Sequence, residues 1–419
     1  MIYRVTKRYL TCIGLSACLV SSPAMAWEEY ENRLLDIIGN IKSGQSDDAL
    51  NEVRDLVSQK PTSRLGNLIY ADLMAAQAAS LTLPGSLAPD PEQEALSGLR
   101  HELKSRWSRH TENTDRIATR VPARILKASR TSRNIVYADL TESRLYVYEN
   151  RNGKLNLVDD YFVTQGLKGA HKRKEGDQKT PVGVYYTTGF ISGATLPSKY
   201  GPGALPINYP NPIDRQYSRT GYGIWIHGTE PYLLNRAPQA SDGCLSLNNE
   251  DFLDVNRSLH RYRHVPVIID DNPRWLSPEQ LVRRKSEMIN TLHAWKEAWE
   301  SRDADSLFSF YDPRRFNTAD DDFENWARKK ELVLAIHENL KLTIRDIELF
   351  EYPGEQNVVM ADFEQELESD EFSSTIRKQQ YWRQSDNGEW KVIFEGLSQK
   401  NPPRSTIAGN ATKKSSSSS

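Results

Sequence analysis

The sequence is poor in cysteine, in long apolar runs and in charge of one sign. Only three of its 419 residues are cysteines, which excludes a framework of several disulfides. The 54 Lys and Arg residues nearly balance the 56 Asp and Glu residues, so no overall field favours a nucleic acid as partner. No apolar run reaches the roughly 18 residues that a membrane-spanning helix needs. A chain of this length instead predicts two or three folded domains without a transmembrane span.

The first 26 residues have the pattern of a secretory signal peptide. Basic residues precede a short apolar stretch at 9–20, and the small-x-small sequence Ala24-Met25-Ala26 follows. The pattern predicts cleavage after Ala26 and export to the periplasm or cell envelope. The sequence Leu15-Ser16-Ala17-Cys18 also resembles a lipobox, so a lipoprotein anchored through Cys18 is the alternative. Cleavage after Ala26 leaves Cys244 as the one thiol, which is either a buried apolar side chain or a reactive group.

Changes in hydrophobic period divide the rest of the chain and predict a multidomain α+β protein. Residues 27–130 have helical spacing, as in Leu34, Ile37 and Ile38, and predict a docking or dimerisation region through which the chain forms a homodimer. Residues 133–270 alternate as short strands and predict a mostly β domain. Residues 283–398 begin with a helical pattern and continue as three strand-like runs, and residues 399–419 predict a disordered tail. The three runs are Leu340–Tyr352, Asn357–Glu368 and Phe372–Glu395, the last turning at Asp386-Asn387-Gly388.

The β region contains the residue types of an acyl-transfer site. His227 follows an apolar run, and Ser241-Asp242-Gly243-Cys244 follows one loop later. A cysteine attacks as its thiolate, and a nearby imidazole can take the thiol proton. Gly243 can adopt conformations closed to other residues, so it can direct its own amide and that of Cys244 towards a developing oxyanion. A histidine, a connecting loop and the run Ser241–Cys244 therefore contain the parts of an acyl-transfer site.

These residues resemble the signature of the YkuD-type L,D-transpeptidase catalytic domain. His227-Gly228-Thr229 and Ser241-Asp242-Gly243-Cys244 carry the resemblance, and it extends over 133–270. Supporting motifs are Arg144-Leu145-Tyr146-Val147-Tyr148 and Thr180-Pro181-x-Gly183-x-Tyr185. The resemblance implies that Cys244 is the nucleophile that forms an acyl-enzyme and that His227 is its base. It also implies an oxyanion hole formed by the Gly243 and Cys244 amides in the loop with Ser241 and Asp242, with no metal and no organic cofactor. Residues 283–398 resemble an NTF2-like domain, which some secreted L,D-carboxypeptidases carry beside a YkuD-type domain.

The resemblance implies a cysteine acyl transferase acting on peptidoglycan stem peptides, with roles in cell-wall biogenesis and cell shape. Candidate substrate contacts are Gly228, Thr229 and Tyr222, with a packing role as the alternative for Tyr222. The commonest family motif has histidine where this chain has Asp242, and arginine where it has Ser246. These departures leave two other hypotheses open. One is an L,D-carboxypeptidase that uses water as acceptor, and the other is a non-catalytic envelope scaffold.

Overall fold

The computed structural model describes residues 23–77, 90–111, 117, 119–259, 262, 264–370 and 372–400. The apolar stretch of the expected signal peptide, together with Cys18, lies outside the described residues. Within the described residues, no helix is both long enough and apolar enough to cross a membrane. Of the expected tail, 399–419, the structure describes only the first two residues. Lys400 is buried and its Nζ contacts Glu348 Oε2 at 2.8 Å, so an ion pair holds the chain this far.

Within its described residues the N-terminal part contains four helices, as the apolar spacing predicts. Leu34, Ile37 and Ile38 lie on one face of the first helix and pack against the next two helices. A buried face at this spacing stabilises helices that would be marginal alone. The helices are α1 (Pro23–Lys42), α2 (Ser46–Gln59), α3 (Arg64–Ala76) and α4 (Asp90–Thr111).

The central β region contains two main sheets that enclose an apolar core. The five-stranded sheet has the order β5-β4-β3-β13-β7, and the four-stranded sheet has the order β12-β10-β9-β8. Helix α7 also contributes to the core, through Phe252 and Val255. The first sheet is formed by β3 (Asn134–Asp139), β4 (Arg144–Arg151), β5 (Lys154–Phe162), β7 (Gly183–Tyr186) and β13 (Pro266–Asp270), and the other elements are β6 (Gln165–Gly166), β8 (Ile191–Ser192), η1 (Gly193–Thr195), η2 (Ser198–Tyr200), β9 (Gly203–Pro206), α6 (Pro212–Gln216), β10 (Trp225–His227), β11 (Gln239–Ser241), β12 (Leu245–Ser246) and α7 (Asn249–Leu259).

The C-terminal part consists of helices packed against a long antiparallel sheet. Met288, Leu292, Trp295 and Trp299 line the inner face of the first helix, at the spacing expected of a buried stripe. The helices are α8 (Pro278–Ser301), α9 (Ala304–Phe308) and α10 (Phe323–Ile336), and the strands are β15 (Lys341–Glu351), β16 (Val358–Glu368), β17 (Ser373–Gln384) and β18 (Trp390–Leu397). The predicted fold class, helices followed by a β-rich domain and an α+β domain, is confirmed.

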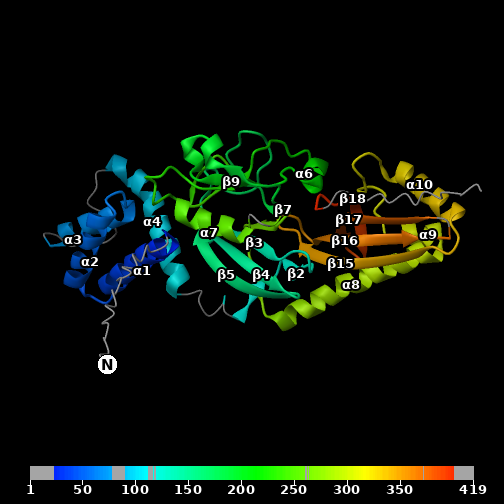
Figure 1. Cartoon of the computed structure of the whole chain (residues 1–419), viewed down its shortest axis with the longest axis horizontal. Coiled ribbons are helices and arrows are strands. Elements are labelled where there is room, and N and C mark those ends of the chain that lie inside the picture. Colours follow the sequence, from blue (N-terminus) through cyan, green and yellow to red (C-terminus); the bar gives the residue numbers. More distant parts are fainter. Residues whose placement is uncertain are drawn as a thin grey trace, which may run out of the picture.

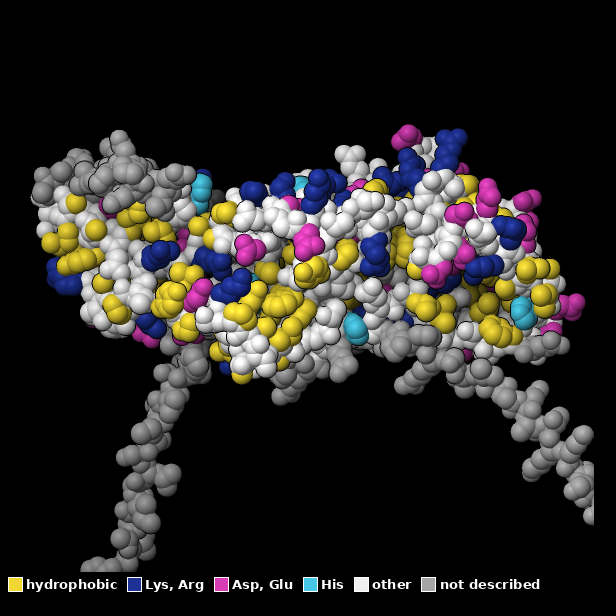
Figure 2. Space-filling model, turned by 90° about the horizontal axis from the view of Figure 1, so that it is seen from above, with side chains coloured by type: hydrophobic (Ala, Val, Ile, Leu, Met, Phe, Trp, Pro, Cys, Tyr) yellow, Lys and Arg dark blue, Asp and Glu magenta, His cyan; other side chains and the backbone are white. Residues whose placement is uncertain are grey.

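The chain segment before the central domain links it to the C-terminal sheet. Strand β2 (Ile125–Lys127) pairs with β15, and β1 (Val121–Pro122) pairs with β14 (Trp275–Leu276). One apolar cluster contains Tyr137 and Tyr186 from the central domain together with Phe350 from β15. Figure 1 shows the three parts in a row along the longest axis, with the blue N-terminal helices at one end and the orange sheet at the other. On the face seen in Figure 2, basic, acidic and apolar side chains are intermixed, in keeping with the near-zero net charge.

Candidate active site

Two short parallel strands bring the predicted histidine and cysteine together. In the pairing of β10 with β12, Ile226 lies opposite Leu245, and His227 lies opposite Ser246. Ile226 and Leu245 are fully buried in the core, so alternation turns their neighbours to the other face. Cys244 precedes Leu245 by one residue and therefore shares the face of His227 in a diagonal position. Neighbouring strands lie about 4.8 Å apart and rise about 3.3 Å per residue, so the backbones of this diagonal pair lie about 8 Å apart.

The turn before Cys244 requires glycine at position 243. Gly243 has φ +123°, which L side chains rarely adopt, and a Cβ there would lie 2.6 Å from Lys179 O. Ser241 Oγ accepts a hydrogen bond from Gly243 N at 3.1 Å and donates one to Cys244 O at 2.7 Å. Ser241 thus fixes the turn that presents the cysteine. In this resting state the Gly243 N–H already donates to Ser241 Oγ. That hydrogen bond has to break before the amide can bind an oxyanion, as expected from the sequence.

The local contacts of His227 suit a base that starts neutral. Its Nδ1 lies 2.5 Å from Gly228 O, and because a carbonyl can only accept, Nδ1 carries the proton. The other ring nitrogen, Nε2, keeps its lone pair for a substrate or thiol proton. The ring packs edge-on against Tyr200 with centroids 4.9 Å apart. Burial lowers the pKa of His227 from 6.5 to about 4, so the imidazole is neutral at physiological pH.

Cys244 is also neutral in the resting site. Its side chain is buried, and burial raises the pKa of the thiol above its ordinary value, opposed in part by the Trp225 backbone. The thiol donates to Gly223 O at 3.4 Å. In the described part of the chain no hydrogen bond joins the thiol to the imidazole. The resting pair is therefore a protonated thiol beside a neutral base, and charge has to develop when a substrate arrives.

The remaining predicted residues differ in their exposure. Asp242 lies at the rim, where its carboxylate is 3.8 Å from Lys199 Nζ, and Tyr222 is 75% exposed. Thr229 is buried and its N–H donates to Asn249 Oδ1 at 2.8 Å. A Cβ at Gly228 would lie 2.4 Å from the same oxygen, so close packing requires glycine there. Asp242 and Tyr222 remain accessible to a substrate, whereas Gly228 and Thr229 shape the backbone behind His227.

Sequence reasoning missed the arginine beside this pair. Arg236 Nη1 donates to Ser246 Oγ at 2.9 Å, and its Nη2 donates to Ala240 O at 2.7 Å. Ser246 faces His227 across the strand pair, so the guanidinium lies next to the predicted base. Arg236 lies in an irregular loop without period or motif, so no sequence signal indicated its position.

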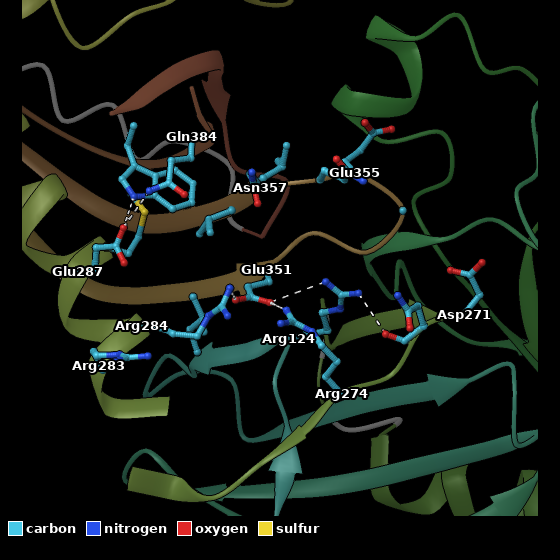
Figure 3. Close-up of a pocket in the computed structure, with 18 of the residues that line it drawn as sticks. Arg124, Asp271, Arg274, Arg283, Arg284, Glu287, Glu351, Glu355, Asn357 and Gln384 are labelled. Carbon is cyan, nitrogen blue, oxygen red and sulfur yellow. Dashed lines mark hydrogen bonds and ion pairs between the residues drawn. The ribbon is translucent and has the colours of Figure 1, made fainter. Parts of the chain in front are cut away.

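A large cavity among the described residues lies elsewhere. It has a volume of about 1130 Å³, is located between the central domain and the C-terminal sheet, and contains none of the predicted site residues. Figure 3 shows the guanidinium groups of Arg124, Arg274 and Arg284 gathered around the Glu351 carboxylate. Arg124 also contacts Asp270 at 2.8 Å. These charged side chains form ion pairs across the boundary between the two domains. The walls of the cavity therefore hold the domains together.

Neither the site nor the rest of the described chain shows a metal-ligand cluster. No group of three or more His, Cys, Asp or Glu side chains is placed to hold an ion within the described residues.

Comparison with known proteins identifies the two larger domains. Residues 133–269 match the L,D-transpeptidase catalytic domain, YkuD, and residues 287–396 match the Cds6 C-terminal NTF2-like domain. The helical cell shape determining protein Pgp2 from Campylobacter jejuni is 26% identical, with a TM-score of 0.56 over 65% of this chain and 95% of that chain. Bd1075 from Bdellovibrio bacteriovorus is 24% identical, with a TM-score of 0.58 over 67% of this chain and 99% of that chain. A search of curated proteins found no match.

Proposed function

Because residues 133–269 form a YkuD-type L,D-transpeptidase domain, we propose that Cys244 and His227 catalyse acyl transfer on peptidoglycan stem peptides. The bond cleaved would be that between the third residue, a diamino acid, and the terminal D-alanine. The observation that carries the proposal is the strand pairing that sets the thiol and imidazole on one face, within the matched domain. Peptidoglycan lies in the cell envelope, which agrees with the predicted export signal at 1–26.

The geometry supports a proton path in which His227 acts twice. As the sulfur attacks the carbonyl carbon, His227 Nε2 takes the thiol proton and the carbonyl π electrons become the oxyanion. The imidazolium forms while Nδ1–H remains bonded to Gly228 O, which stabilises the new positive charge. Because burial disfavours the imidazolium, it gives its proton readily to the departing amine of D-alanine. A thioester on Cys244 remains.

The acceptor decides between transpeptidation and hydrolysis. An amine acceptor gives a cross-link or an anchored protein, whereas water gives a stem peptide shortened to three residues. Asp242 and Ser246, which depart from the commonest motif, are the residues that favour the L,D-carboxypeptidase alternative. Both outcomes require the Cys244 acyl-enzyme, whereas a scaffold does not.

The test is to incubate tetrapeptide muropeptides with the protein and analyse the products by mass spectrometry. New amide-linked dimers would show transfer, and tripeptide monomers would show hydrolysis. We expect Cys244→Ala to abolish either product and His227→Gln to reduce it by at least about 100-fold, the usual scale of general-base catalysis. Unchanged muropeptides that still bind normally would contradict the enzyme proposal and favour the scaffold.

A homodimer formed through the N-terminal helices remains part of the proposal. In the structure, α1, α3 and α4 contact loops of their own chain, including Asn235. Sedimentation equilibrium of the full chain over a range of concentrations would show whether a second copy also binds there.

A further inference from the structure

Arg236 is a partly buried cation that, among the described residues, donates two hydrogen bonds, both to neutral oxygens. These are the Ser246 hydroxyl and the Ala240 carbonyl. Glu230, Asp242 and Cys244 are the acidic groups that raise its pKa, but neither carboxylate forms a salt bridge with Arg236 within 4.0 Å in the described chain. Burial lowers the pKa of Arg236, yet arginine keeps its charge in proteins. Folding thus removes a positive charge from water without giving it a carboxylate partner, which costs free energy. A function of this charge in binding would explain why the site keeps it.

The guanidinium occupies the same face as the reactive pair. Ser246 lies directly opposite His227 and two residues beyond Cys244, so all three share one face of the strand pair. The Arg236 charge accordingly lowers the pKa of both His227 and Cys244. Lys199 and Asp242 are the other charged groups that act on both side chains, and both are more than half exposed at the rim.

The N-terminal helices hold the loop that carries this arginine. The adjacent residue, Asn235, is fully buried. Its Oδ1 accepts from Leu65 N at 3.2 Å and from Tyr30 Oη at 3.3 Å, and its Nδ2 donates to Glu102 Oε1 at 3.1 Å. Three helices therefore fix the loop through one side chain. A guanidinium held in advance loses little conformational freedom when it binds a ligand.

We propose that Arg236 binds a carboxylate group of the substrate beside the bond that Cys244 attacks. A guanidinium offers several donors in a planar fork that matches a carboxylate, and the charge-assisted bonds are among the strongest in proteins. A neutral side chain could satisfy Ser246 and Ala240 without the cost of burying a charge. The inference rests on the proposed acyl transfer. A stem peptide offers two such groups, the terminal carboxylate of D-alanine and the side-chain carboxylate of the diamino acid.

The first experiment needs no stem peptide, because it uses two small reagents of nearly the same shape. Iodoacetate carries a carboxylate and iodoacetamide a carboxamide, and both alkylate a thiolate. We would measure the modification rate of Cys244 for each reagent in the full chain by peptide mass spectrometry. The ratio of the two rates cancels any change in thiolate population. We expect Arg236→Gln to lower the iodoacetate-to-iodoacetamide ratio about 5- to 10-fold, the loss expected for one charge-assisted contact at a partly exposed site.

Two variants control for charge and for folding. Arg236→Lys keeps a positive charge and should retain part of the ratio. Arg257→Gln removes an exposed arginine paired with Asp254 on α7 and should leave the ratio unchanged. Thermal melting would confirm that each variant folds. A ratio that does not respond to Arg236→Gln, or a Cys244 that neither reagent reaches, would overturn the proposal.

The second experiment assigns the carboxylate, with Cys244→Ala as the background so that the ligand is not consumed. Binding of a tetrapeptide is compared with binding of its C-terminal amide and of its analogue amidated on the diamino acid. Amidation of the contacted group should weaken binding by about 10-fold or more, and adding Arg236→Gln should remove that difference. If no tetrapeptide binds although the reagent ratio depends on Arg236, the carboxylate-binding role of Arg236 is supported and the stem peptide is contradicted as the substrate. If the tetrapeptide binds but neither amidation weakens its binding, the carboxylate-binding role of Arg236 is contradicted instead.

Discussion

At the predicted catalytic pair, burial acts against the charged form of both residues. It lowers the pKa of His227 and raises that of Cys244, so a thiolate–imidazolium pair does not form in the resting site. A protected, protonated thiol also oxidises slowly, because the thiolate is the reactive species. Within the described residues Cys244 is the one thiol, so it can stay reduced and still react when a substrate enters.

The buried histidine should make the fold sensitive to mild acid. The unfolded chain binds a proton at His227 near pH 6.5, whereas the folded chain does so only near pH 4. Stability should therefore be complete above pH 6.5 and fall as the pH drops to about 4, by up to about 3 kcal/mol. Urea unfolding of the wild type and His227→Gln across this range would measure the difference, with His101→Gln on α4 as a control for loss of an imidazole elsewhere. An acid-induced loss as large in His227→Gln as in the wild type would contradict this.

The cysteine turn should tolerate no side chain at position 243. Gly243→Ala combines a positive φ with a Cβ at 2.6 Å from Lys179 O, whereas Gly153→Ala has φ +87° with open space around it. Both changes carry the backbone cost of about 1 kcal/mol, and crowding should cost Gly243→Ala about 2 kcal/mol more. The free energy of unfolding in urea measures both variants. Equal losses would show that the Lys179 carbonyl moves aside freely.

The sequence was informative about the reactive residues but not about their supports. His227 and Cys244 belong to motifs, and the positive φ of Gly243 follows from the need for a tight turn. Arg236 and Asn235 lie in a loop without period, and the three partners of Asn235 are 133, 170 and 205 residues away along the chain. No local pattern reports contacts at such a distance, so these residues had to be found in the structure.

At the scale of elements, the N-terminal helices and the loop between β10 and β11 form one unit through Asn235. Asn235→Ala would leave the buried Leu65 N–H and the Glu102 carboxylate short of a partner. We expect a loss of about 2–4 kcal/mol and faster amide hydrogen exchange in α3 and in the loop. Asn40→Ala removes an exposed bond to Glu52 and is the matched control. Exchange that changes in neither element would mean that the helices hold the loop by apolar packing alone.

Long periodic elements were predicted more accurately than short ones. The expected strands at 340–352 and 357–368 correspond to β15 and β16 within one residue at each end, because their alternation and turn residues are local signals. Strand β2 has three residues, too few to show a period. It precedes the central domain in the chain but pairs with β15, which follows that domain. The sequence therefore predicted the C-terminal sheet but not its fifth strand.

At the scale of the whole molecule, the central and C-terminal domains share an apolar cluster in addition to the core of each. Tyr137, Tyr146 and Tyr186 from the central domain pack in a single cluster with Phe350, Tyr352 and Tyr381 from the C-terminal sheet. The pairing of β2 with β15 and the contact of Arg124 with Asp270 extend this junction. The hydrophobic pattern alone indicated separate domains. The period of the apolar residues shows which face of a helix or strand is buried, but not which element covers that face.

A shared apolar cluster predicts that a cavity in the C-terminal sheet loosens the central domain. Phe350 and Phe363 are both fully buried on neighbouring strands, but Phe350 packs in the shared cluster and Phe363 packs under α8. Each change to alanine should cost about 3–5 kcal/mol. We expect Phe350→Ala to speed amide hydrogen exchange in β3 and β13 as well as in β16, and Phe363→Ala to do so mainly in the C-terminal sheet. If Phe350→Ala leaves β3 and β13 as protected as in the wild type, the two domains are cooperative units of their own, and the aromatic contact between them is only a docking surface.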